Sequence, residues 1–450
     1  MEAATTLRRR VLVGAVAAAV AVAFADSSIV VLALPKIYGA FNTSIVGVSW
    51  VITSYNLVVA LTAFALVPLV ARVDTGGVSR VGLALFFAGS TGSAASWSLA
   101  ALIVFRCIQG IGAALLLAGA LALLAALTGS AARGVAIWTA AGTFGAALGP
   151  ALGGVLTQLF DWRAIFVFQA PVALVALIAA FESHLHPHVA AGRRPSTLAN
   201  LALAFLFGAL VGALFLGVLL VITVWGLSPV IGALVVSALP IGALAARTVE
   251  RDLSPRVNAV AGASVLAAGL VALALLPRVS NLLVSLALAL CGLGLGLAVP
   301  ILSHAAVPPE RGLVRAGTTT IGARHAGLVV ALALIAPLLS HDLERGGQNA
   351  LLAGTRIILD GNVPLRQKVP VALDLRTALE SAPKGVVPDL KEPFDSRGAQ
   401  HDANLRHVRD DLIGTLQATL TRSFRLSFLL SALFALAALV PILVRRWDAS

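Results

Sequence analysis

Charge and cysteine are both scarce in this chain. Charged residues make up 12% of its 450 residues, whereas hydrophobic residues make up 59%, and the mean hydropathy is +0.97. A soluble chain of this length needs a much larger polar surface, so the composition excludes a water-soluble globular protein and predicts a polytopic membrane protein. The two cysteines, Cys107 and Cys291, both lie in apolar runs, which argues against a disulfide framework.

Motifs for nucleotide and metal chemistry are also lacking. The sequence contains no Gly-x-x-x-x-Gly-Lys-Ser/Thr motif, so we do not expect ATP-driven transport by this chain alone. His341, His401 and His407 lie among many carboxylates, but they show no recognisable metal spacing and no nucleophile accompanies them. We therefore predict neither an enzyme nor a bound metal or cofactor.

Long apolar runs are what the chain has instead. Since ~20 residues cross the hydrocarbon core of a bilayer as a helix, runs of about 18–27 residues predict transmembrane helices. The sequence predicts an all-α polytopic membrane protein with twelve transmembrane helices, in two six-helix halves around a central cavity. The predicted helices cover residues 11–34, 46–70, 79–97, 99–127, 133–159, 164–182, 199–224, 228–247, 257–277, 281–303, 314–339 and 424–444.

The first predicted helix has a competing interpretation. Arg8-Arg9-Arg10, an apolar run and then Ala23-Phe24-Ala25 imitate a secretory signal peptide with its cleavage site. The apolar run continues past Asp26 to Leu34, however, which makes it long enough to span a bilayer. We therefore interpret residues 11–34 as a retained transmembrane helix.

The basic residues orient these helices. With the N-terminus in the cytoplasm, fifteen Lys and Arg residues fall on the inside, against three in the short outside loops, namely Lys36, Arg163 and Arg278. The positive-inside rule then places both termini in the cytoplasm. The net charge of +12 is explained by this orientation, so it predicts no nucleic-acid partner. Abundant alanine and 28 Arg against 4 Lys are typical of a GC-rich bacterium, so we expect a bacterial cytoplasmic (inner) membrane.

The predicted helices divide the chain into five parts. These are an N-terminal six-helix half (1–182), a cytoplasmic linker (183–198), helices 7–11 (199–339), an extracytoplasmic segment (340–423), and the last helix with a cytoplasmic tail (424–450). The linker contains "HLHPH", which suggests a metal site. A solvated linker is the favoured interpretation because no carboxylate or cysteine joins the histidines.

The segment 340–423 breaks the apolar pattern. It contains eleven of the twenty acidic residues and is far longer than the ~4–6 residues of an ordinary connection. "NALLAGTRIIL" and "LDLRTALE" read as short amphipathic helices. Leucines at helical spacing from Ala403 onward predict that the last helix projects several turns beyond the bilayer. Two interpretations stay open: a packed extracytoplasmic cap, and a domain that binds an extracytoplasmic partner or lipid.

Two charges interrupt the apolar runs at membrane depth. Asp26 lies in "AFADSSIVVLALP" and Arg106 in "LIVFRCIQGIGAALL". At ~1.5 Å per residue, Asp26 is about 22 Å from the inner end of its helix, and Arg106 is about 10 Å from the outer end of its own. In a hydrocarbon core ~30 Å thick, the two side chains therefore lie at nearly the same depth. We expect the two to neutralise each other, with Asp26 as the proton-coupling residue. The alternative is that Asp26 caps a helix break or pairs only structurally.

Two helices carry motifs that resemble those of the major facilitator superfamily. In the predicted helix 99–127, the order Arg106, Gln109, Gly110 and Gly112 resembles the superfamily's Arg-x-x-Gln-Gly-x-Gly. In 133–159, glycines on one face favour close helix packing, and Pro150 predicts a bend. That face resembles the helix 5 motif of the superfamily's antiporter branches through Gly145, Gly149, Pro150, Gly153 and Gly154.

The loop 70–80 and its counterpart in the second half resemble the superfamily's gate motif. Asp74, Gly77 and Arg80 fit that motif, while Thr75 stands where an arginine is usual. A degenerate copy contains Glu250 and Arg251. The resemblance implies a cytoplasmic gate at these residues, and echoes in both halves support a duplicated architecture.

The first helix places the resemblance within one branch. "DSSIVVLALP" resembles the Asp-x-Thr-Ile-Val-Asn-x-Ala-Leu-Pro signature of drug:proton antiporters that usually have fourteen spans, with Ser28 in place of Thr and Val31 in place of Asn. "WVITSYNL", "VPPERGLVRAG" and "ARHAG" fit the same branch. The resemblance does not cover 340–423, and we predict twelve spans rather than fourteen.

These observations predict a secondary active exporter of hydrophobic or amphipathic small molecules, of the multidrug type, working by proton antiport and alternating access. Few polar groups in helices 1, 7 and 10 favour neutral or cationic cargo. Alternatives are export of a lipid or cell-envelope precursor, and a membrane sensor or assembly protein acting through 340–423. Arg106 and Gln109 are predicted charge partners in the cavity, and the substrate-cavity candidates are Tyr55, Asn56, Trp138 and Gln169. Arg324 and His325 are candidate polar residues of the second half of the protein, and a packed, structural histidine is the alternative for His325.

Overall fold

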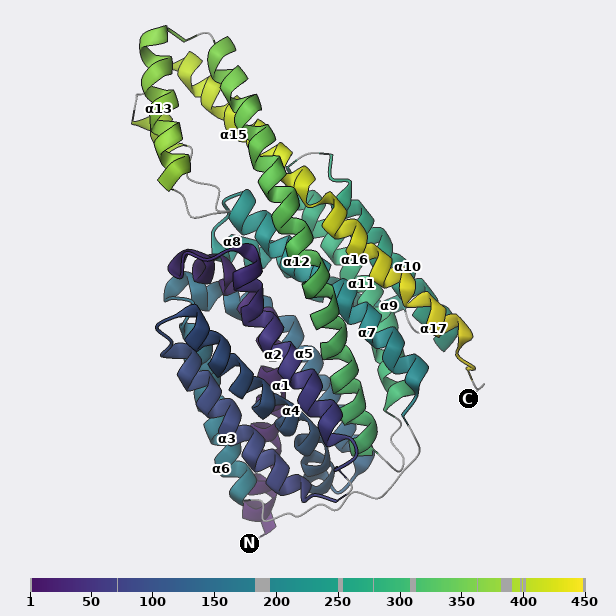
Figure 1. The fold of residues 1–450 in the computed structure, drawn as a ribbon. Helices are drawn as coiled ribbons and strands as arrows, with labels where there is room; N and C mark the ends of the chain where they lie inside the picture. The colour runs from purple at the N-terminus through teal and green to yellow at the C-terminus, as the bar shows by residue number, and fades with distance from the viewer. Residues whose placement is uncertain are drawn as a thin grey trace.

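The computed structural model describes residues 2–70, 72–182, 195–249, 254–277, 279–307, 313–361, 363–381, 391–396, 399 and 402–447. Within these ranges every regular element is a helix, and the helices lie alongside one another in a long bundle (Figure 1). The all-α class predicted from the sequence is therefore confirmed.

The N-terminal half contains six long helices, in the order that the apolar runs predict. They are α1 (Glu2–Ala40), α2 (Ile45–Leu66), α3 (Thr75–Ala94), α4 (Leu99–Thr128), α5 (Ala131–Leu159) and α6 (Ala164–Glu182). Because α3 begins at Thr75, half of the stretch 70–80 that we predicted as a loop belongs to a helix. Asp74 is the reason: its carboxylate accepts the backbone N–H groups of Gly76 and Gly77 and so caps the helix start.

The second half contains more interrupted helices. Its elements are α7 (Thr197–Val211), two π-helical stretches η1 (Gly212–Leu216) and η2 (Leu219–Val224), α8 (Pro229–Val236), α9 (Ala238–Val249), α10 (Pro255–Ala274), α11 (Asn281–Ala306), α12 (Leu313–Asp360), α16 (Arg425–Ala437) and α17 (Leu439–Val444). Together α7, η1 and η2 fill one predicted span, as do α8 with α9 and α16 with α17.

Length and composition qualify most of these helices as membrane spans. Among the described residues ten helices are long and apolar enough to cross a bilayer, or eleven when the two arms of the bent α5 count as one span. The helix that falls short is α3, whose sequence is rich in Gly, Ser and Thr. It packs against α4 and α6, so it belongs to the same bundle. Each of the twelve predicted spans thus corresponds to helical structure.

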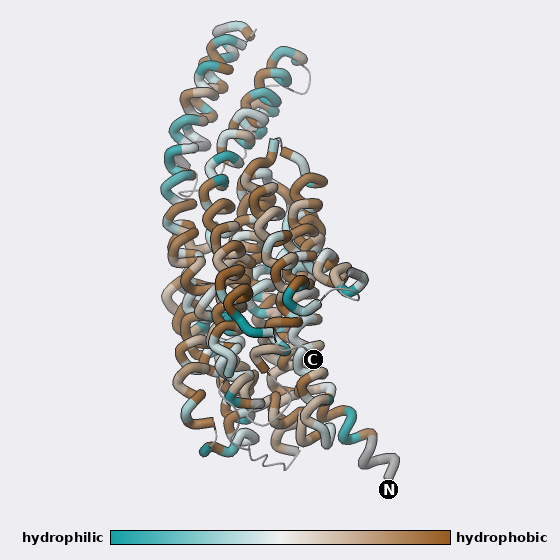
Figure 2. Tube along the Cα trace, turned by 90° about the vertical axis from the view of Figure 1, so that its right-hand side faces the viewer, coloured by the Kyte–Doolittle hydropathy of each residue, from teal (hydrophilic) through white to brown (hydrophobic). Residues whose placement is uncertain are grey.

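The outer surface of the bundle is apolar. Phe144, Leu234, Leu282 and Leu433 lie on four different helices, and each exposes 60–69% of its surface. Hydrophobic residues predominate along the bundle, while hydrophilic residues are more frequent in the helices that extend beyond it, at the top of Figure 2. Apolar side chains exposed all round a bundle match a lipid environment and not water.

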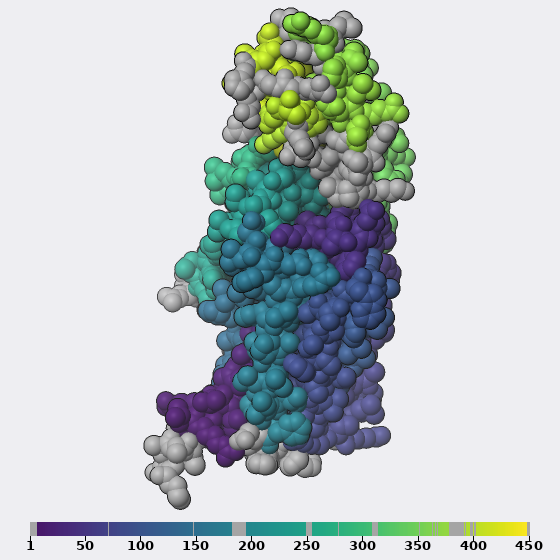
Figure 3. Space-filling model, turned by 90° about the vertical axis from the view of Figure 1, so that its left-hand side faces the viewer, coloured from purple at the N-terminus to yellow at the C-terminus, as the bar shows by residue number. Residues whose placement is uncertain are grey.

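Two helices continue beyond the bundle and form an arm, defined here as the described residues of 340–423. It stands at the end of the molecule remote from the N-terminus (Figures 1 and 3). The last helix is preceded by a helical extension as predicted, since α15 (Ala403–Ser423) leads directly into α16. The predicted end of the preceding helix at residue 339 is wrong. There, α12 continues for 48 residues to Asp360, and "NALLAGTRIIL" is its last part rather than a separate helix.

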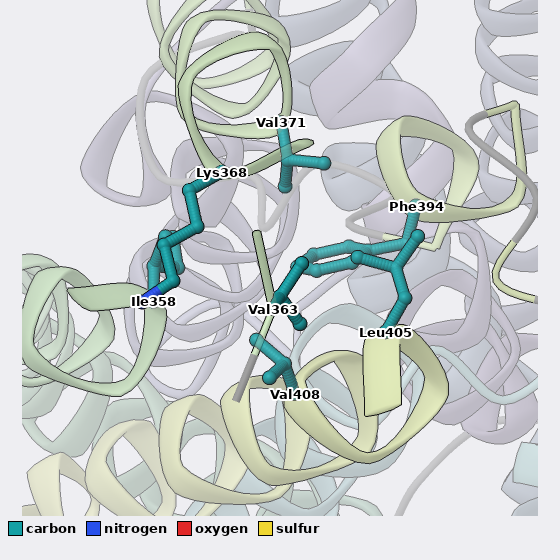
Figure 4. Close-up of a pocket in the computed structure, with 7 residues that line it drawn as sticks. All are labelled: Ile358, Val363, Lys368, Val371, Phe394, Leu405 and Val408. Atoms are coloured by element: carbon teal, nitrogen blue, oxygen red, sulfur yellow. The ribbon is translucent and has the colours of Figure 1, made fainter. Parts of the chain in front are cut away.

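The arm has an apolar core of its own. The second amphipathic stretch, "LDLRTALE", lies in α13 (Leu365–Ser381), which packs with the short α14 (Glu392–Asp395) near α15. The residues that line the small pocket between these helices are Ile358, Val363, Lys368, Val371, Phe394, Leu405 and Val408 (Figure 4). Trp225, just past η2, joins the base of the arm to the bundle, because its Nε1 donates to Thr421 Oγ1 at 2.9 Å.

We expect Phe394→Ala to loosen the arm without disturbing the bundle. Phe394 is fully buried, and removing such a ring from a core costs about 3–5 kcal/mol. Hydrogen exchange should accelerate in α13 and α15 and stay unchanged in α1 and α4. Leu373→Ala is the matched control, because Leu373 is 57% exposed on α13. Equal exchange in both variants would contradict a packed arm.

Candidate functional site

The two membrane-depth charges meet in the middle of the N-terminal half. Arg106 Nη1 donates to Asp26 Oδ1 at 2.8 Å, and Arg106 Nη2 lies 2.6 Å from Asp26 Oδ2. Both side chains are 0% exposed. The pairing expected from their depths is therefore present, with one hydrogen bond and one further ion-pair contact between the guanidinium and the carboxylate.

Two further acceptors meet the guanidinium. Arg106 Nε donates to the backbone oxygen of Val51 on α2 at 3.0 Å, and Nη1 also donates to Gln109 Oε1 at 2.7 Å. The Val51 carbonyl could not be inferred from any side-chain motif. A buried charge pair needs such additional hydrogen bonds to offset the loss of water.

Gln109 is the second centre of this polar cluster. Its Nε2 lies 3.3 Å from Asp26 Oδ1, 2.9 Å from Ser90 Oγ and 2.6 Å from Gln169 Oε1. The cluster therefore joins α1, α3, α4 and α6. The sequence indicated Gln109 and Gln169, but it gave no signal for Ser90, which lies in the Gly- and Ser-rich α3.

Aromatic rings close the cluster on one side. The Cζ atom of Arg106 lies 4.2 Å from the ring centre of Tyr55 and 5.7 Å from that of Phe166. The hydroxyl of Tyr55 donates to the backbone oxygen of Ala23, one turn before Asp26. These rings add cation–π stabilisation while keeping water out. Tyr55 thus lies beside the charge pair, as a candidate cavity residue.

Asn56 connects the cluster with the second half of the protein. Ser27 Oγ donates to Asn56 Oδ1 at 3.1 Å, and His325 Nδ1 on α12 lies 2.7 Å from the same oxygen. Because an amide oxygen only accepts, this arrangement places a hydrogen on His325 Nδ1. The His325 ring also stands edge-on to Tyr55, with 6.3 Å between ring centres. A polar contact thus bridges the two halves within one helical turn of Asp26.

The glycine face of α5 allows α1 to approach closely. A methyl group at Gly145 would meet the backbone oxygen of Ala21, at Gly149 the Ser28 hydroxyl, and at Gly153 the backbone oxygen of Ile29. Gly154 faces the other way, toward Pro229 and Ala233 of α8. The helix packing predicted from these glycines is therefore present, and it positions the segment of α1 that carries Asp26.

The bend predicted at Pro150 is also present. The two parts of α5, Ala131–Ala146 and Leu148–Leu159, are bent relative to each other by 43°. Pro150 has no N–H to offer the carbonyl of Ala146, four residues earlier. Ser28 Oγ lies 3.5 Å from that oxygen, so α1 places a hydroxyl beside the freed acceptor.

Other predicted residues lie outside the cluster. Trp138 Nε1 donates to the backbone oxygen of Leu117, and its ring packs edge-on against Phe24. It therefore stabilises helix contacts and is not joined to the polar cluster. Arg324 points to α11 and α7 rather than to Asp26.

The predicted gate residues are described in part. Arg80 Nη2 lies 3.4 Å from Asp74 Oδ2, and its guanidinium lies over the Phe181 ring of α6. Gly77 supplies one of the N–H groups that Asp74 accepts. Glu250 and Arg251 lie outside the described residues.

The site is closed in this conformation. Asp26, Asn56, Arg106, Gln109 and Gln169 are all 0% exposed, so no space for a water molecule adjoins them. Opening of this site therefore requires a movement of helices, as alternating access does.

Comparisons with known proteins agree on one family. The sequence profile of the Major Facilitator Superfamily matches residues 16–311. Among similar curated proteins are the methylenomycin A resistance protein of Bacillus subtilis, 38% identical over 160 residues, and the drug efflux pump JefA of Mycobacterium tuberculosis, 34% identical over 185 residues. These matches cover 35% and 40% of this chain, but only 34% and 36% of the relatives, so the chain spans about a third of their length.

Solved structures agree on the fold. A bacterial homologue of the human lysosomal transporter Spinster, in an inward-facing and unoccupied conformation, has a TM-score of 0.63 at 16% identity, with 98% of this chain and 99% of that chain covered. A D-xylose–proton symporter has a TM-score of 0.56 at 13% identity, covering 72% and 89%. At such identities the likeness concerns the fold alone.

A double-mutant cycle on Asp26 and Arg106 should reveal strong coupling. Asp26→Asn and Arg106→Gln should each lower the free energy of unfolding by about 3–5 kcal/mol, because each leaves a buried partner uncompensated. The double variant should lose less than the sum of the two, by about 1–3 kcal/mol, in unfolding titrations in mixed micelles. The exposed pair Asp161–Arg163 is the control, and additive losses at Asp26 and Arg106 would refute the coupling.

Gly153→Val should weaken the contact between α1 and α5. The new side chain meets the Ile29 backbone, and such overpacking costs about 1–3 kcal/mol. Thermal unfolding in detergent should begin at a lower temperature than for the wild type. Gly14→Val is the control, since a side chain at Gly14 meets no atom within 4 Å. Equal stability of the two variants would contradict the packing described for α5.

Proposed function

The chain belongs to the Major Facilitator Superfamily, and from that premise we propose that it is a secondary active exporter that moves hydrophobic or amphipathic small molecules outward as protons move inward. Similar proteins carry names of drug resistance and drug efflux. The proposal extends that theme to this chain, whose outer surface and helix count suit a multi-pass membrane transporter. The energy source is the proton gradient, without a bound cofactor.

The buried pair of Asp26 and Arg106 is the observation that carries the proposal. The pair is charge-balanced while the site is closed, with both side chains shut away from water. When Asp26 takes up a proton, its carboxylate becomes neutral and no longer offsets the guanidinium. Arg106 keeps the Val51 carbonyl, the Gln109 oxygen and the Tyr55 ring, so the proton weakens one contact selectively.

The contact between Asn56 and His325 couples the protonation of Asp26 to the second half of the protein. Ser27, next to Asp26, shares the Asn56 oxygen with His325 of α12. A shift of α1 that follows protonation therefore alters a hydrogen bond across the interface of the halves. Proton entry and cargo exit then compete for the same closed site, which is the requirement for antiport.

The charge distribution supports a membrane orientation for this cycle. Fifteen basic residues on the inside against three on the outside favour both termini in the cytoplasm of a bacterial cell. In that orientation the arm of residues 340–423 lies outside the cytoplasm. Protons would then enter from the side on which the arm stands.

A second candidate is export of a lipid or cell-envelope precursor. It is favoured by exposed apolar side chains on the arm, which give lipid-like cargo a surface beyond the bilayer. These residues are Leu352, Leu359, Val369 and Leu373, each 52–66% exposed. A sensor or assembly role for the arm, with a partner outside the cytoplasm, is the third interpretation, and it predicts no transport.

The test is dye efflux from proteoliposomes under an imposed proton gradient. We expect the wild type to move an amphipathic dye, and Asp26→Asn to lose gradient-driven movement by at least about tenfold while dye binding persists, because the neutral amide cannot exchange a proton. Asp161→Asn is the matched control, since Asp161 pairs with Arg163 near the protein surface. Equal efflux by wild type and Asp26→Asn would refute proton coupling at Asp26. Absence of any efflux by the wild type would favour the lipid or partner interpretation.

A further inference from the structure

A second arginine lies at membrane depth, and the proton cycle does not use it. Arg324 is on α12, about 16 Å along the helix from its first described residue. It follows Ala323 and precedes His325, so its side chain leaves the helix on a different face from the one that contacts Asn56. Its relative exposure is intermediate, whereas Arg106 is 0% exposed, so part of Arg324 is open although its Nε is buried.

The contacts of Arg324 leave its charge uncompensated. Nη2 donates to Ser303 Oγ on α11 at 2.5 Å, and Cζ lies 5.0 Å from the ring centre of Phe207 on α7. Nε is buried, and no atom of the described residues accepts its hydrogen. In that same part of the chain no carboxylate pairs with Arg324, whereas Arg106 has Asp26, Gln109 and the Val51 carbonyl.

Burying the Arg324 guanidinium costs free energy unless a ligand pairs with its charge. A buried charged donor without an acceptor carries a large desolvation penalty, and intramembrane charges normally pair or face a ligand. Ser303 provides one neutral acceptor and Phe207 covers one face of the guanidinium. The free N–H groups on Nη1 and Nη2 can bind both oxygens of a carboxylate in a planar, two-pronged arrangement.

We propose that Arg324, with Ser303 and Phe207, binds the carboxylate of an amphipathic acid, whose apolar part lies against the ring of Phe207. The inference rests on the proposed function as an exporter of amphipathic molecules and names the cargo class. It replaces the neutral or cationic cargo expected from the sequence with an organic acid. The site belongs entirely to the second half, so it is separate from the pair of Asp26 and Arg106.

Matched probes test the site through binding. Pyrenebutyrate and pyrenebutanol share an apolar ring system and differ in the charged head group. Each is titrated into the full chain in nanodiscs of phosphatidylcholine, and energy transfer from tryptophan to pyrene reports binding. The wild type should bind the acid at least about tenfold more tightly than the alcohol. A single charge-assisted hydrogen bond to the carboxylate is strong enough to account for a difference of that size.

Variants assign that preference to Arg324. Arg324→Gln should bind acid and alcohol equally, with the alcohol affinity unchanged. Arg324→Lys should keep a reduced preference, because a lysine retains the charge but not the planar fork. Arg163→Gln is the control, since Arg163 is paired with Asp161. An unchanged alcohol affinity also reports that each variant has folded.

Three outcomes overturn the inference. Equal binding of both probes by the wild type removes the anion site, and a preference that survives in Arg324→Gln places it elsewhere. If phosphatidylglycerol in the nanodisc abolishes the preference at probe concentrations that saturate the phosphatidylcholine disc, the site holds a lipid phosphate instead of a cargo acid.

Efflux of the same probes from proteoliposomes separates this inference from the proposed function. Efflux of the alcohol without any acid preference in binding supports the exporter and refutes the anion site. An acid preference that Arg324→Gln removes, without efflux of either probe, supports the anion site and refutes the exporter.

Discussion

A carboxylate and a guanidinium withdrawn from water must stay in register, because a shift of either helix would leave a bare charge in a medium of low dielectric constant. The contact between Asp26 and Arg106 therefore fixes the height of α1 against α4. Gln109 extends this constraint to α3 and α6 through Ser90 and Gln169. Four helices of the N-terminal half are tied to one another at the depth of a single charge pair.

The glycine face of α5 also helps to hold the α1 segment that carries Asp26 in position. Without side chains at Gly145, Gly149 and Gly153, the α5 backbone lies directly against α1, and α5 bends near Pro150. Between the halves, by contrast, the polar link near the charge pair is the contact of Asn56 with His325. An N-terminal half whose helices are tied to one another at the charge pair, and which packs as a unit against the second half, is suited to rocking motion.

The two membrane-depth arginines show how the surroundings assign different roles to one side chain. Arg106 is fully buried and contacts a carboxylate, an amide and a carbonyl, so it ties α4 to α1 and α2. Arg324 is of intermediate exposure and has a hydroxyl and an aromatic ring as partners, so it lacks the acceptors that Arg106 has and suits the proposed anion. In this protein, the difference between structural pairing and ligand binding is a difference in the number of acceptors.

The sequence by itself determined the helices, the matching depth of Asp26 and Arg106, and the bare face of α5, because hydropathy, rise per residue and glycine spacing are local properties. Only the tertiary structure decided that α12 continues to Asp360. Hydropathy marks where a chain leaves the hydrocarbon and not where its helix ends. Packing against α15, which Gly346 contacts at Ser423, supports the helix through its glycines although glycine favours a break. It also decided that Gln109 meets Ser90 while Trp138 meets Phe24, since the rotation of each helix about its axis is set by its neighbours.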